Sequence, residues 1–80
     1  MFDPQRIRAL LVTKLPDCEA LVEGDDGEHF HAEVTSTAFV GKTRVQQHQL
    51  VYGALGDHMK RDIHALALKT YTPDTWPHRA

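Results

Sequence analysis

The stretch GDDGEHFHAEV (residues 24–34) joins a turn signal to a strict alternation of apolar and polar residues. Its first four residues, Gly-Asp-Asp-Gly, are typical of a tight turn, because glycine and aspartate accept backbone angles that other residues avoid. In the EHFHAEV that follows, phenylalanine, alanine and valine occupy alternate positions, so their side chains share one face of a strand. The preceding CEALVEG alternates more weakly. The sequence therefore predicts a β-hairpin over residues 18–35.

Before this hairpin, residues 3–15 (DPQRIRALLVTKL) predict an α-helix. Asp3 is a suitable cap, Pro4 suits the first helical position, and Pro16 is expected to stop the helix. The apolar residues fall three or four apart, as the buried face of a helix requires. They are Ile7, Leu10, Leu11 and Leu15.

After the hairpin, a helix is expected to begin at about Thr43. Its predicted apolar stripe consists of Val45, Tyr52, Leu55 and Met59. Gly53 and Gly56 interrupt this stripe, and each costs about 1 kcal/mol relative to alanine in a helix. We therefore expect either two short helices or one kinked helix.

The apolar run IHALALKTYT (residues 63–72) fits a buried strand, although its alanines and leucines leave a helix open. Thr72 and Pro73 then suit the start of one terminal helical turn, which would place Trp76 against the sheet. The predicted order is α-β-β-α-(α)-β-(α).

This order predicts an α+β fold in one small domain covering residues 1–80. The sheet should have three strands and be mixed, because one hairpin is antiparallel and the last strand follows a right-handed helical crossover. Helices should cover one face of this sheet. The other face would be open to solvent or to a partner.

The composition limits the classes of function. The chain has 80 residues, a formal net charge of −2 and one cysteine, which excludes an internal disulfide and a four-cysteine metal site. Cys18 is expected to be a small buried residue, with a redox thiol as the alternative. A dedicated nucleic-acid binder normally carries excess positive charge, so the negative net charge argues against this class of function. No targeting segment or catalytic constellation is recognisable, so we expect a cytoplasmic protein without enzymatic activity.

Two long stretches resemble the BolA family, close to its short YrbA/IbaG-type branch. They are EHFHAEVTSTAFVGKTRVQQHQLVYGAL (residues 28–55) and IHALALKTYTPDTW (residues 63–76). They carry the family's F-x-G, R-V-x-x-H-x-x-V-Y and I-H-A-L…T-P-x-x-W patterns in order, within a similarity covering roughly residues 18–76. An ordered set of this length is far more specific than one short motif.

The resemblance implies a fold similar to class II KH domains and a heterodimer with a monothiol glutaredoxin that holds a shared [2Fe-2S] cluster. Glutaredoxin and glutathione would supply thiolates, and this chain would supply the histidine of its HAL motif, His64. An imidazole is a competent ligand of such a cluster. Without its partner, the chain is expected to be a monomer that carries no cofactor.

The second ligand is less clear, because other branches of the family carry a histidine or cysteine in the loop that is EGDDGE here. Asp25 and Asp26 offer only carboxylates, which suit iron–sulfur clusters poorly. His29 follows this loop and matches the family's His-Phe position, so the resemblance makes it the best remaining candidate, with a hydrogen-bonding or surface role as the alternative. His31, on the same predicted face and ~7 Å from His29, is expected to be solvated.

Nucleic-acid binding and transcriptional control, including an acid-stress response, form the alternative function. Lys42, Arg44, His48, Lys60, Arg61 and Lys69 could form one basic patch for a partner or for DNA. The G-x-x-G clamp of KH domains is absent, so such binding would be weak and strongly salt-dependent. For His48 a plain helix-surface role is the alternative, and for His58 and His78 surface roles are expected.

Overall fold

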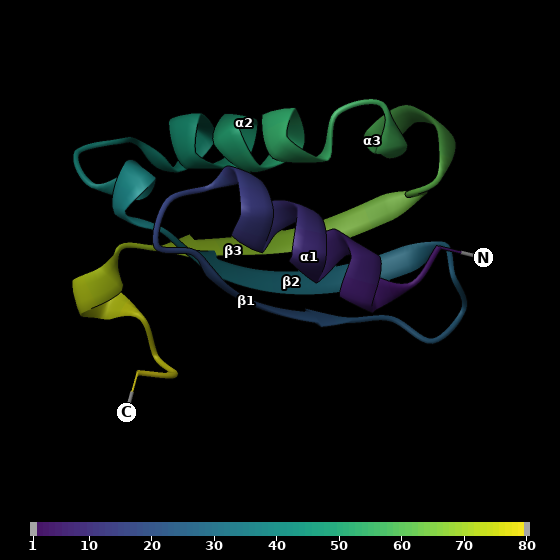
Figure 1. Ribbon diagram of the computed structural model, residues 1–80, viewed down its shortest axis with the longest axis horizontal. Helices are drawn as coiled ribbons and strands as arrows, with labels where there is room; N and C mark the ends of the chain where they lie inside the picture. Colours follow the sequence, from purple (N-terminus) through teal and green to yellow (C-terminus); the bar gives the residue numbers. More distant parts are fainter. Residues whose placement is uncertain (1, 80) are drawn as a thin grey trace.

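A computed structural model describes residues 2–79 and shows three helices on one face of a three-stranded sheet (Figure 1). The elements are α1 (Pro4–Lys14), β1 (Glu19–Glu23), β2 (His29–Thr35), the 3-10 turn η1 (Thr37–Phe39), α2 (Arg44–Leu55), α3 (His58–Arg61), β3 (Ala65–Tyr71) and the 3-10 turn η2 (Pro73–Thr75). The strand order is β1-β2-β3, with β1 antiparallel and β3 parallel to β2. The predicted α+β fold with a mixed sheet is confirmed.

The local signals placed α1 and the hairpin correctly. The Asp3 carboxylate accepts a hydrogen bond from the Gln5 backbone N–H at 2.8 Å, as expected of a helix cap. In β2, the alternate residues Phe30, Ala32 and Val34 are buried beneath the helices. Glycine is required at position 24, since a Cβ there would lie 2.6 Å from Phe30 Cδ1. The turn therefore packs directly against Phe30, the first buried residue of β2, and leaves no room for a side chain at position 24.

The predicted apolar stripe of α2 is wrong at two positions. Val45 and Tyr52 are 66% and 40% exposed, respectively. The residues of α2 that are buried against the sheet and α1 are Gln47, Val51, Ala54 and Leu55. Leu55 is buried as predicted, but the rest of the buried face includes a glutamine, which apolar spacing alone cannot indicate. Of the two glycines, Gly56 ends α2 with a φ of 57°, whereas Gly53 lies within the helix.

Gln47 is buried because its side-chain amide joins three segments. Its Nε2 donates to the carbonyl oxygens of Phe39 at 3.2 Å and Lys42 at 3.1 Å. Its Oε1 accepts a hydrogen bond from Thr70 Oγ1 in β3 at 2.6 Å. A buried polar group is tolerated when its hydrogen bonds are made, so Gln47 ties the segment before α2 to the edge strand.

The prediction that residues 63–72 contain a strand is confirmed by β3, but the expected burial of that strand is wrong. β3 pairs with β2 along only one edge, and its residues alternate between exposed and half-buried. Leu66 and Leu68 contact the core, while Ala65, Ala67 and Lys69 point to the face without helices. Alanine tolerates exposure to solvent, so the apolar composition of residues 63–72 overstated how deeply this strand is buried.

The C-terminal segment turns back toward the sheet. Trp76 is 4% exposed and packs edge-on against Tyr71, the last residue of β3, with ring centroids 5.7 Å apart. His78 Nε2 lies 2.9 Å from Glu33 Oε2 on the sheet face opposite the helices. Trp76 is thus packed against the sheet, as predicted. Within residues 2–79, no helix has the length and apolarity needed to cross a membrane.

Candidate metal-binding site

Parallel pairing of β2 and β3 brings the two histidines predicted as metal ligands together. His29 opens β2 and is paired with Ala65, the first residue of β3, so His64 lies beside the start of β2. The backbone N–H groups of His64 and Ala65 both donate to the carbonyl oxygen of Glu28 at 3.0 Å. The two histidines thus meet at the end of the sheet where β2 and β3 begin, although a helical crossover separates them in sequence.

The two imidazole rings are adjacent and accessible. The ring centroids of His29 and His64 are 5.2 Å apart, with the rings at 78° to each other, and both residues are exposed. Within the described part of the chain, no group of three or more His, Cys, Asp or Glu side chains is arranged to hold a metal ion. Two imidazoles alone would leave most ligand positions of a metal centre to be filled by other donors.

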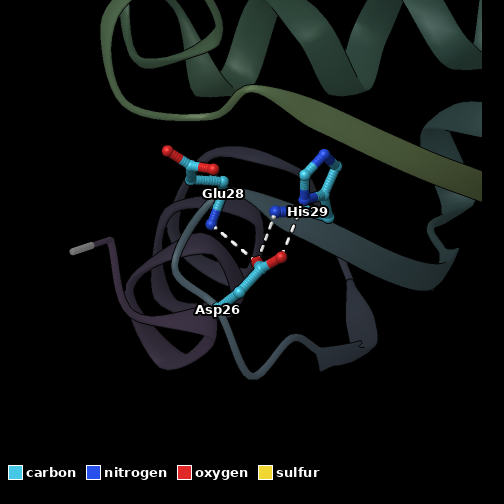
Figure 2. A network of polar contacts seen from close by, with 3 residues as sticks. All are labelled: Asp26, Glu28 and His29. Atoms are coloured by element: carbon cyan, nitrogen blue, oxygen red, sulfur yellow. Dashed lines mark hydrogen bonds and ion pairs between the residues drawn. The ribbon is translucent and has the colours of Figure 1, made fainter.

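Asp26 holds the His29 side chain in place (Figure 2). Its Oδ1 accepts the backbone N–H groups of Glu28 at 2.9 Å and His29 at 2.8 Å, and its Oδ2 lies 2.7 Å from His29 Nδ1. The hydrogen bond from the His29 backbone N–H is the main reason that the pKa of Asp26 lies well below its usual range. The hydrogen bond to the Asp26 carboxylate raises the pKa of His29 above its ordinary value.

Four histidines remain, of which His78 contacts Glu33 and the other three lie elsewhere. His31 lies on the face without helices, and His58 Nδ1 lies 2.6 Å from Asp62 Oδ2. His48 Nε2 is buried without a hydrogen-bond partner among the described residues, and the ring lies edge-on to Tyr52. None of the three is brought to the His29 and His64 pair within residues 2–79.

The six residues predicted as a basic patch lie in three separate places. Lys42, Arg44 and His48 are at the start of α2, while Lys60 and Arg61 are on α3 beyond its other end. Lys42 and α3 lie at opposite ends of α2, whose twelve residues span about 18 Å, and His48 lies within this helix. Lys69 is on the face of the sheet opposite the helices. The structure therefore does not bring the six together into one surface for a polyanion, because the helix and the sheet keep them apart.

Cys18 is half-buried just before β1 and packs against the core. Burial raises the pKa of its thiol to about 11, and Arg8 opposes this shift only partly. We expect Cys18 to react with iodoacetamide at pH 8 at least about tenfold more slowly in the native protein than in urea. The thiolate fraction is about a hundredfold lower, and the greater nucleophilicity of a high-pKa thiolate recovers about tenfold. Equal rates would show an accessible, reactive thiol.

Sequence reasoning considered Asp26 only as a poor metal ligand and did not predict its contact with His29. The missed signal was local: an aspartate two or three residues before a strand often accepts the backbone N–H groups that lead into it. The Gln47 network was also missed, and no short-range pattern indicates it.

Comparison with known proteins assigns residues 4–75 to the family described as "BolA-like protein". The acid stress protein IbaG of Escherichia coli K12 is 38% identical over 71 residues, which cover 88% of this chain and 83% of IbaG. The chloroplastic and mitochondrial SufE-like protein 1 of Arabidopsis thaliana is 47% identical over 51 residues, but these span only 14% of that protein. A BolA homologue from Coxiella burnetii has a similar structure, with a TM-score of 0.83 and 48% identity over 92% of this chain and 95% of that one.

Proposed function

Because this chain belongs to the BolA-like family, we propose that it is an adaptor without catalytic activity that binds a [2Fe-2S] cluster jointly with a monothiol glutaredoxin and glutathione. In this role it modulates the stability and transfer of the cluster in iron–sulfur cluster assembly and iron homeostasis. In this proposal the cluster is held between the two proteins, and the isolated monomer carries no cofactor.

One observation carries the proposal: two accessible imidazoles lie with their centroids 5.2 Å apart at the edge where β2 and β3 begin. Imidazole nitrogen is a suitable ligand for iron, and histidine can replace cysteine on one iron of a [2Fe-2S] centre. Cys18, the one thiol of this chain, is half-buried with a raised pKa and is a poor candidate for a further ligand. The thiolates must then come from the partner and from glutathione.

In this proposal His64 and His29 are the residues that hold the cluster. The cluster supplies redox-active iron and exchangeable ligand positions when it is bound. The backbone N–H of His64 donates a hydrogen bond to the Glu28 carbonyl, which places His64 beside the start of β2. His29 lies beside it with its Nδ1 bound to Asp26. Exposure of both rings lets a partner approach without opening the core.

The test is anaerobic reconstitution of the chain with a monothiol glutaredoxin, glutathione, iron and sulfide. We expect a heterodimer by size-exclusion chromatography whose visible absorption and circular dichroism differ from those of the glutaredoxin homodimer. This chain reconstituted alone should show no such bands, because it lacks the thiolates. Absence of both a heterodimer and a spectral change would contradict the proposal. The alternative, DNA binding, would then be tested by measuring affinity at several salt concentrations.

A further inference from the structure

We propose that Asp26 is a positioning residue that determines which nitrogen of His29 is offered to a metal centre, namely Nε2. This inference rests on the proposed function and assigns a role to a side chain that does not itself bind the metal. It also explains how a loop without histidine or cysteine contributes to the site.

The geometry assigns the proton on His29. An ionised carboxylate only accepts hydrogen bonds, so Asp26 Oδ2, at 2.7 Å from His29 Nδ1, requires that Nδ1 carry the hydrogen. In the neutral imidazole, Nε2 then keeps the lone pair that a metal needs. The position of Asp26 on the Nδ1 side of the ring, visible in Figure 2, leaves Nε2 free of this contact.

Asp26 also organises the backbone on which both histidines depend. Its Oδ1 accepts the N–H groups of Glu28 and His29, and the carbonyl of the same Glu28 accepts the N–H groups of His64 and Ala65. One peptide segment therefore links the carboxylate to the starts of β2 and β3. Displacing it would disturb the spacing between the two rings as well as the orientation of His29.

The two histidines differ in how firmly their rings are held. The imidazole of His29 has a carboxylate partner, whereas the imidazole of His64 makes no hydrogen bond within residues 2–79 and lies edge-on to the His29 ring. We infer that His29 presents a preset ligand atom, while the His64 ring can adjust when the partner binds. A carboxylate behind a ligating histidine typically changes metal affinity by 10 to 100-fold.

Asp26→Asn tests the assignment without changing the size of the side chain. The amide oxygen can still accept the two backbone N–H groups, but the amide nitrogen would donate to His29 Nδ1 and so force the hydrogen onto Nε2. The matched control is Asp25→Asn, which removes the same charge from the neighbouring exposed residue, for which no hydrogen bond is seen among the described residues.

Two readouts keep this inference separate from the proposed function. Long-range ¹H–¹⁵N spectra of the isolated chain, recorded where imidazole is neutral, should show His29 with hydrogen on Nδ1 in the wild type and in Asp25→Asn, and on Nε2 in Asp26→Asn. In the reconstituted heterodimer, the cluster should dissociate about tenfold faster or more with Asp26→Asn than with Asp25→Asn.

An unchanged tautomer in Asp26→Asn, or equal dissociation rates for the two variants, would overturn the role of Asp26. Failure of the wild type to form any cluster-bridged heterodimer would instead overturn the proposed function. In that case the spectra of the isolated chain would still decide whether Asp26 sets the tautomer of His29.

Discussion

Replacing His64 with alanine is expected to abolish the visible circular dichroism of the cluster-bridged heterodimer, leaving at most about a tenth of the wild-type signal. The imidazole is the donor that the BolA resemblance assigns to the cluster, and the described residues offer no third side chain arranged to replace it. The residue is exposed, so truncation creates no core cavity and the free energy of unfolding should change by about 0.5 kcal/mol or less. Loss of the spectrum with unchanged stability would identify a ligand.

His31→Ala is the matched control for this experiment, because His31 is also an exposed histidine but lies outside the His29 and His64 pair. It should leave the spectrum unchanged. His29→Ala distinguishes the two interpretations of that residue: a shifted or weakened spectrum would make it the second ligand, and a wild-type spectrum would leave it a surface residue. A full signal from His64→Ala would refute the proposed ligand set.

Gln47→Leu is expected to lower the free energy of unfolding by about 2–4 kcal/mol. The substitution conserves volume approximately, but it removes the partner of the Lys42 carbonyl oxygen and of the Thr70 hydroxyl, while the Phe39 carbonyl oxygen keeps only the Lys42 backbone N–H. Each buried polar group left unsatisfied costs about 1–3 kcal/mol, and water reaching the less buried Lys42 oxygen limits the sum. Urea denaturation at equilibrium measures this change.

Gln49→Leu, an exposed substitution on the same helix, is the control and should change the free energy of unfolding by about 0.5 kcal/mol or less. Thr70→Val combined with Gln47→Leu should cost less than the sum of the two single changes, since one hydrogen bond is removed by both. If Gln47→Leu unfolds at the wild-type urea concentration, the network has no structural importance.

Local chemistry explains why so much of the architecture was predictable. The cap at Asp3, the Gly-Asp-Asp-Gly turn and the alternation in β2 each act within a few residues, so a linear pattern contains their full physical cause. The errors occurred where burial depends on distant segments. β3 is half-exposed because it lies at the edge of the sheet, and α2 turns a glutamine inward because β3 supplies Thr70.

The candidate site divides in the same way. Donor types, the single cysteine and the carboxylate-only loop follow from the sequence, and the resemblance to a family pointed to His64. Only the tertiary structure decided that His29 lies beside His64 and that Asp26 holds its ring. The two histidines meet because β2 and β3, which a helical crossover separates in the sequence, pair in parallel. No periodicity or spacing in the sequence indicates such long-range backbone pairing.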